Sequence, residues 1–429
     1  MIKKFLTNRM VVEAVSYSLA TGINRGLVLL ALPFLGKRLT IEEFGLWSLT
    51  QIIVSLGAPV VSLNGAAGIL REGIGNPPLG FSVFRYFNKV TALISMLAII
   101  IVSLVKVDWL FYAILLVVIE GFASMISIWY RSRDQHQLYF SVVFSKLSAL
   151  VFAILIVGEP ADLTGILFYQ TFFGALFLLP FFIHVYFFEK IQRINFDRKA
   201  VLIFCAALIP HGLSQWIMSS SDRIIIKSFL GDSELGQYSV TYTLALCLML
   251  LNSGLGMSVG VDVVKNYKLW TTTNRRSRGI VLYSVAFTLV SIALVAFVVQ
   301  FKPHLTFLNG LRMESLTLLP WILNGMYFMG IYLFYINYLN YLRESVLLSS
   351  ITIGAAIVNV LITLSLIQSW GIHGAAVSAF ISYLALMAAS MIFSIKKAEL
   401  AKESYMRDVA VVVVTATIIY VAVLWILPG

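Results

Sequence analysis

Thirteen apolar stretches, most of them long enough to cross a bilayer as a helix, constrain this 429-residue chain more than any other feature. Such a helix needs about 20 predominantly apolar residues. Runs such as 114–119 and 409–414 do not alternate in polarity, as the strands of a membrane β-barrel do. We therefore predict an all-α, polytopic membrane protein. The predicted spans are 12–35, 44–70, 82–105, 109–130, 138–157, 163–188, 200–229, 235–262, 279–300, 315–341, 346–367, 372–395 and 409–427.

The composition agrees with a membrane location. Hydrophobic residues make up 60% of the chain and charged residues only 12%, whereas soluble domains carry roughly 25% charged residues. The two cysteines, Cys205 and Cys247, lie in apolar stretches without a CxxC pair. We predict no metal ligand, no disulfide and no cofactor from them.

The basic residues predict the orientation of the chain. Of 31 Lys and Arg, 22 fall on one side if the N-terminus is cytoplasmic, counting Arg85 and Lys89 at the start of span 82–105 with the connection 71–81, and five fall on the other side. The remaining four, Arg25, Lys146, Arg223 and Lys227, lie inside spans. This bias follows the positive-inside rule and predicts a multi-pass protein with a cytoplasmic N-terminus. It also accounts for the net charge of +11, so no nucleic-acid partner is predicted.

The connections between spans argue against an enzyme. None is long enough for an extramembrane domain, and the chain contains neither a GxxxxGK[ST] phosphate loop nor an HExxH motif. A membrane polysaccharide polymerase is expected to need a sizeable outer loop. The longest outer connection, about 301–314, is small, so this function is the less favoured alternative.

A short internal repeat predicts the domain organisation. Residues 39–50 and 230–241 align without gaps at an offset of 191 and are identical at five positions, including Gly45/Gly236. Each copy follows the first span of a six-span half, which predicts two parallel six-helix bundles. We predict an N-terminal half, a cytoplasmic linker, a C-terminal half, and a basic segment with a thirteenth helix. Their bounds are 1–188, 189–199, 200–395 and 396–429.

Three stretches indicate a family. They are DRIIIKSFLGDSELGQYSVTY (222–242), LPFLGKRLTIEEFGLWS (32–48) and NVLITLSLIQSWGIHGAAVS (359–378). Together they resemble motifs of the bacterial Wzx-type O-antigen and polysaccharide flippases. These belong to the multidrug/oligosaccharidyl-lipid/polysaccharide exporter superfamily. The chain departs from the usual pattern at Gln368, where proline is usual, and in its thirteenth helix, since the usual number is twelve.

The resemblance implies a cargo and a place of action. The expected cargo is an undecaprenyl-pyrophosphate-linked oligosaccharide repeat unit of O-antigen or capsule type. It would move across the bacterial inner membrane, from the cytoplasmic to the outer leaflet, by alternating access. The resemblance also suggests membrane lipids, a polysaccharide polymerase and a chain-length regulator as partners.

Ionisable residues inside spans are the candidate site residues, since such groups normally face a cavity or a partner. An anionic pyrophosphate requires a fixed cation, and arginine stays charged and binds phosphate oxygens in pairs. We predict Arg25 as the first substrate-binding residue, with Lys146 and Arg223 as further candidates. No catalytic residue is predicted.

Three other residues are candidates for ion coupling or charge pairing: Glu120, Asp222 and His211. Each also has a structural interpretation. Glu120 could pair with Lys146 or Arg25, Asp222 could brace a neighbouring span, and His211 could satisfy backbone groups freed by Pro210.

Two other transporter functions remain open. An ion-coupled multidrug exporter of the same superfamily would need acidic groups in its cavity. The deep charges of this chain are more basic (Arg25, Lys146, Arg223) than acidic (Glu120, Asp222), which favours an anionic cargo. A flippase for the peptidoglycan lipid precursor is expected to have fourteen spans, and thirteen are predicted.

Overall fold

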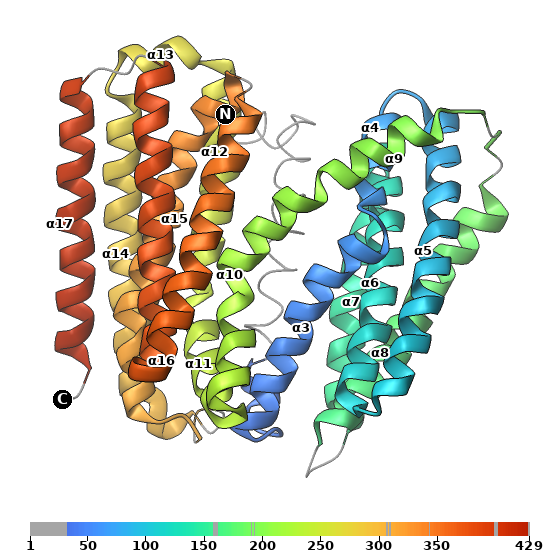
Figure 1. Ribbon diagram of the computed structural model, residues 1–429, viewed down its shortest axis with the longest axis horizontal. Coiled ribbons are helices and arrows are strands. Elements are labelled where there is room, and N and C mark those ends of the chain that lie inside the picture. Colours follow the sequence, from blue (N-terminus) through green and yellow to red (C-terminus); the bar gives the residue numbers. More distant parts are fainter. Residues whose placement is uncertain are drawn as a thin grey trace, which may run out of the picture. The chain divides into compact units, whose positions relative to one another are not determined.

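The computed structural model describes residues 32–157, 162–189, 191–192, 194–305, 308, 310–342, 344–398 and 402–427. Within these ranges the regular secondary structure is helical and contains no strand (Figure 1). The predicted all-α fold class is confirmed.

The helices follow the predicted spans closely. Span 12–35 lies largely outside the described residues, and each of the other twelve coincides with described helical segments. By length and apolar composition, ten described helices are able to cross a membrane, or eleven if the bent pair of α11 (Asp232–Ala245) and α12 (Cys247–Lys265) is one span. The 49° bend of that pair lies at Leu246.

The described residues form two compact units. The first contains residues 46–213, and the second contains residues 214–427 together with the described part of Val28–Gly45. Helices α3 (Ile41–Val61) and α10 (Ile209–Leu230) each contribute residues to both units. Residues 39–45 of the first repeat copy therefore pack within the same unit as the second copy.

The first unit is built around α6, which packs against α4, α5, α7 and α8. Its core holds large aromatic side chains, including Phe84, Phe87, Trp129 and Tyr130. The helices of this unit are α4 (Gly65–Gly73), α5 (Pro77–Val105), α6 (Asp108–Ser132), α7 (His136–Ile156), α8 (Leu163–Ile183) with the π-helical turn His184–Phe188, and α9 (Arg198–Ala207).

The second unit is built around α15, whose residues are buried along almost its whole length. Helix α15 packs against α12, α14, α16 and α17. The elements of this unit after α11 and α12 are α13 (Tyr267–Thr272), α14 (Arg275–Phe301), the 3₁₀ turns Lys302–His304 and Met313–Leu318, α15 (Leu319–Tyr341), α16 (Ser345–Ala398) and α17 (Lys402–Ile426).

Local sequence signals begin and end several of these helices. Asn76 accepts a hydrogen bond from the Leu79 amide (3.3 Å) just before Pro77 and Pro78, a combination typical of a helix N-terminus. Gly371 has φ +55° and reverses the chain inside α16, which is a hairpin of two helices. Across that hairpin, Thr363 Oγ1 donates to Ser378 Oγ at 2.8 Å.

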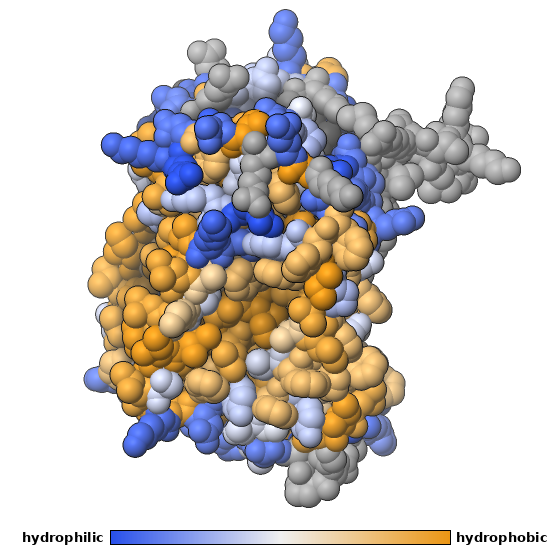
Figure 2. All heavy atoms as spheres, turned by 90° about the vertical axis from the view of Figure 1, so that its right-hand side faces the viewer, coloured by the Kyte–Doolittle hydropathy of each residue, from blue (hydrophilic) through white to orange (hydrophobic). Residues whose placement is uncertain are grey.

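The outer surface of the first unit is apolar where a membrane helix meets lipid. Exposed apolar side chains are frequent on α5 and α8, for example Leu93, Leu104, Phe172 and Leu179. Figure 2 shows one face of the molecule with an apolar band between two hydrophilic ends. This distribution is the one expected of helices that span a bilayer.

Candidate functional site

The first unit holds an ion pair at the middle of two membrane-spanning helices. Lys146 Nζ on α7 lies 2.6 Å from Glu120 Oε1 on α6. The side chains are only partly buried, with exposed fractions of 19% for Lys146 and 31% for Glu120. Of the two partners that the sequence left open for Glu120, the structure shows Lys146. The pair combines a cation and a carboxylate that both retain accessible surface.

The second unit holds a fully buried charged cluster around Asp222 on α10. The Asp222 carboxylate accepts hydrogen bonds from the Tyr238 hydroxyl and from the Arg223 amide, the latter at 2.8 Å. Tyr238 lies on α11, so the bond connects two neighbouring helices. This geometry matches the bracing interpretation of Asp222.

Arg223 lies in the same cluster and is almost completely buried, with 5% of its surface exposed. Its guanidinium lies 4.3 Å from the centre of the Tyr242 ring, within the range of a cation–π interaction. Tyr242 is in turn hydrogen-bonded to Tyr383 on α16. The aromatic rings and the adjacent carboxylate compensate the buried positive charge.

A second set of hydrogen bonds joins the same elements. Ser221 Oγ donates to Asn359 Oδ1 at 3.1 Å, and Ser378 Oγ donates to the Asn359 carbonyl at 2.7 Å. Asn359 and Ser378 begin and end the third family-like stretch, and Ser221 directly precedes the first. Residues of two motifs that are far apart in the sequence are thus brought together inside the second unit.

The two copies of the internal repeat meet at their aligned glycines. A Cβ atom added to Gly45 would lie 2.7 Å from the Gly236 amide nitrogen, and one added to Gly236 would lie 2.1 Å from the Ile41 carbonyl oxygen. Real Cβ atoms do not approach backbone this closely, so both positions require glycine. Aligned residues of the two repeat copies therefore touch each other within the second unit.

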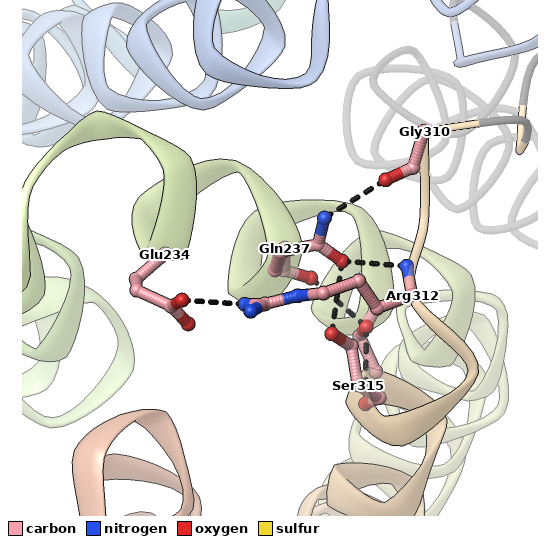
Figure 3. Close-up of polar contacts among 6 residues, drawn as sticks. Glu234, Gln237, Gly310, Arg312 and Ser315 are labelled. Carbon is pink, nitrogen blue, oxygen red and sulfur yellow. Dashed lines mark hydrogen bonds and ion pairs between the residues drawn. The ribbon is translucent and has the colours of Figure 1, made fainter.

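A polar network lies beside this glycine contact (Figure 3). The Gln237 side-chain amide donates to the Gly310 carbonyl at 2.8 Å, and its oxygen accepts from the Arg312 amide and the Ser315 hydroxyl, both at 2.9 Å. The Arg312 side chain reaches Glu234 at 2.5 Å. These bonds fix the connection before α15 against α11.

A buried ion pair attaches the thirteenth helix to the second unit. Arg276 Nε on α14 lies 2.7 Å from Asp408 Oδ2 on α17, and both side chains are at least 97% buried. The Tyr335 hydroxyl on α15 donates to the same Asp408 oxygen at 2.7 Å. Helix α17 is therefore held by a specific buried contact as well as by apolar packing.

The remaining predicted site residues are placed as follows. Arg25 lies outside the described residues. The backbone of His211 lies in the first turn of α10, and its side chain is outside the described part of the structure. Lys227 on α10 forms an ion pair with Asp232 on α11.

Sequence reasoning missed several of these partners. Tyr238, Gln237 and Arg312 received no role, although Tyr238 aligns with Trp47 in the repeat and both side chains are completely buried. The alignment of Tyr238 with Trp47 is the sequence feature that could have identified Tyr238. Arg276 and Asp408 were assigned to basic connections, and a separation of 132 residues gave no indication that they pair.

Neither a family model nor a curated protein sequence matches the chain. Several solved structures are similar to it in fold. The lipid II flippase MurJ in an inward closed conformation is similar with a TM-score of 0.68 and 11% identity, covering 96% of this chain and 98% of that one. The chain has the fold of transporters of the multidrug/oligosaccharidyl-lipid/polysaccharide exporter (MOP) superfamily.

Two further solved structures support this fold. An inward-facing multidrug resistance MATE family transporter of the MOP superfamily has a TM-score of 0.65 at 14% identity, covering 93% of this chain and 98% of that chain. A MOP superfamily transporter from Pyrococcus furiosus, described as having a binding pocket of reverse polarity, has a TM-score of 0.56 at 14% identity. It covers 93% of this chain and 96% of that chain. The prediction of a multi-span helical fold is confirmed.

Proposed function

We propose that the chain is a flippase for an undecaprenyl-pyrophosphate-linked oligosaccharide repeat unit, of O-antigen or capsule type, in the bacterial inner membrane. The unit moves from the cytoplasmic to the outer leaflet by alternating access. Support comes from the family-like motifs, from the MOP fold, and from the resemblance of that fold to a lipid II flippase. The chain contributes membrane helices and charged side chains, and no covalent chemistry is required of it.

The observation that carries the proposal is the Lys146–Glu120 pair. A charged group near the centre of a membrane helix is strongly disfavoured unless it has a partner or a wet cavity. Lys146 has both a partner and exposed surface. When a pyrophosphate arrives, the Lys146 ammonium exchanges the carboxylate for phosphate oxygens, and Glu120 is released to bind a proton or a sodium ion. One pair thus links cargo binding to ion coupling.

Arg25 remains the second cation of the proposed site. An arginine in the first span would supply a permanent charge and a planar fork for two phosphate oxygens. Arg223 has a different environment, since Tyr242, Tyr383 and Asp222 enclose it. We assign Arg223 and Asp222 to bracing α10 against α11 and α16, and the cargo phosphates to Lys146 and Arg25.

The repeat contact lies within the second unit and holds the first part of α3 against α11. Gly45, Gly236 and Ile41 pack backbone against backbone, and Gln237 and Arg312 fix the neighbouring connection. A side chain at either position would hold the contact apart.

The test is the surface polysaccharide of a bacterial strain from which this chain has been deleted. The strain is complemented with wild type, Arg25→Ala or Lys146→Ala at matched expression. We expect deletion to remove long surface chains and to accumulate lipid-linked repeat units on the cytoplasmic side. Wild type restores the chains, and neither variant does. Normal surface polysaccharide in the deletion strain, without a second flippase, would overturn the proposal.

The ion-coupled multidrug exporter is the second candidate, because several of the similar solved structures are MATE transporters. The accessible Glu120 carboxylate is the group that a cationic drug would use. This function predicts that deletion sensitises cells to cationic dyes and leaves the polysaccharide ladder unchanged. Glu120→Gln would then abolish resistance while Lys146→Ala would not.

A further inference from the structure

A groove between α12 and α14, at the end of the second unit where α13 lies, is not used by the mechanism above (Figure 1). Its volume is 1190 Å³. We call it the α12–α14 groove and define it by Leu251, Gly254 and Leu255 on α12, Arg275, Arg278 and Leu282 on α14, with Phe334 of α15 also in its lining. A cavity of this size exceeds most small-molecule pockets, which measure about 300–1,000 Å³.

The two ends of the α12–α14 groove differ in chemistry. Toward α13 it is lined by polar groups, including Asn274, Arg275 and Arg278, and away from α13 it is lined by leucines and Ala286. Several of the leucines expose their side chains, for example Leu282 at 72%. An occupant that satisfies both ends needs an anionic head and a long apolar tail.

The described side chains at the polar end of the groove carry a net charge of about +1. Arg275 Nη2 is paired with Asp262 Oδ2 at 2.8 Å, and the same carboxylate also accepts from Trp270 and Asn266. No carboxylate among the described residues forms an ion pair with Arg278, which is exposed. One phosphodiester carries one negative charge and matches this balance better than a pyrophosphate, which carries more.

The groove also has room for an acyl chain at its centre. A Cβ atom added to Gly254 would meet nothing within 4 Å, so the surface of α12 is open there. The basic connection 263–278 lies at this end, which the charge distribution places on the cytoplasmic side. Anionic lipids of the cytoplasmic leaflet attract basic residues at this depth.

We propose that the α12–α14 groove binds one anionic phospholipid of the cytoplasmic leaflet. Its phosphate lies beside Arg278 and Arg275, and one acyl chain lies between α12 and α14. This site is separate from the Lys146–Glu120 pair, and it does not depend on what the protein transports. The lipid fills the space between the two helices and stabilises the second unit.

The test uses the full-length protein, purified in detergent, stripped of lipid, and titrated with dioleoylphosphatidylglycerol or dioleoylphosphatidylcholine under native mass spectrometry. We expect a preference for phosphatidylglycerol. Arg278→Gln lowers that affinity about fivefold, the factor that corresponds to about 1 kcal/mol for one basic residue near an anionic surface. Gly254→Leu fills the groove and lowers the binding of both lipids.

The control variant is Lys268→Gln, which removes the same charge from an exposed position of α13 that does not line the groove. It should leave the phosphatidylglycerol affinity unchanged. Equal binding of the two lipids, an equal loss in Lys268→Gln and Arg278→Gln, or full binding in Gly254→Leu would each overturn the proposal. So would competition by the soluble headgroup glycerophosphoglycerol at the same concentration, because a free phosphate ester would then suffice.

Discussion

Each of the two units holds a carboxylate and a cation within membrane-spanning helices, and the two pairs lie in opposite surroundings. Lys146 and Glu120 retain 19% and 31% of their side-chain surface, whereas only 5% of Arg223 and 3% of Asp222 is exposed. Both side chains of the Lys146–Glu120 pair thus retain surface that another group could contact. The buried pair is enclosed by Tyr238, Tyr242 and Tyr383. The proposed function therefore uses only the pair whose side chains remain accessible.

The two pairs should also differ in how much each contributes to the stability of the fold. Removing a buried carboxylate leaves its hydrogen-bond donors and any neighbouring buried cation uncompensated in an apolar environment, and it is strongly destabilising. Removing one partner of a solvent-accessible pair has little effect on stability, because water replaces the lost contact. The proposed function requires Lys146 and Glu120 to face a wet cavity. Stability measurements should therefore separate the two pairs before any transport is measured.

The largest expected effect on stability is that of Asp222→Ala. The change removes the acceptor of the Tyr238 hydroxyl and of the Arg223 amide, and it removes the negative charge next to the buried Arg223 guanidinium. We expect a loss of about 3–5 kcal/mol, seen as a large fall in the melting temperature and yield of purified protein. A melting temperature equal to wild type would contradict the bracing role of this cluster.

A second large effect is expected at the thirteenth helix. Asp408→Ala removes the carboxylate that faces Arg276 in the interior and the acceptor of Tyr335, so we expect a loss of about 3 kcal/mol. The matched control is Glu344→Ala, which breaks the exposed Lys397–Glu344 pair and should lower stability by less than about 1 kcal/mol. Thermal unfolding in detergent measures both. Equal melting temperatures for the two variants would show that α17 is held by apolar packing alone.

An intermediate effect is expected where the repeat copies touch. Gly236→Ala places a Cβ atom against the Ile41 carbonyl and should destabilise the protein by about 1–3 kcal/mol, as overpacking does. Gly254→Ala is the control, since the added atom meets open space and the gain in helix propensity is the same. If both variants unfold at the same temperature, the glycine contact is not closely packed.

The smallest effect on stability is expected at the accessible pair. Glu120→Gln and Lys146→Met should each change the free energy of unfolding by less than about 1 kcal/mol. The melting temperature of each purified variant checks this. A loss as large as that of Asp222→Ala would remove the distinction between the two pairs.

The helices were predictable because hydropathy and length are local properties of the sequence. Twelve spans could be checked, and even the short final span, 409–427, forms the membrane-length helix α17. The prolines were less informative. Pro59 lies just before the break between α3 and α4, whereas Pro320 lies in the first turn of α15, where proline is well tolerated.

The partners of the charged residues were only partly predictable. Glu120 and Lys146 stood out because each is an isolated charge in an apolar run, yet only the packing of α6 against α7 could decide between Lys146 and Arg25. No proline lies at Leu246, so no local sequence signal predicts the bend there. The pairing of Arg276 with Asp408 depends on how α17 docks, which no local pattern encodes.

The central claim is that Lys146 contacts the cargo and is not merely the structural partner of Glu120. The most direct test compares Lys146→Met with the double variant Glu120→Gln/Lys146→Met in the polysaccharide assay, at matched expression and melting temperature. A structural pair can be replaced by two neutral side chains, because no charge is left unpaired. The account predicts that the double variant is as defective as Lys146→Met, with surface polysaccharide reduced at least about tenfold, the factor for about 1.4 kcal/mol. Wild-type polysaccharide in the double variant would contradict it.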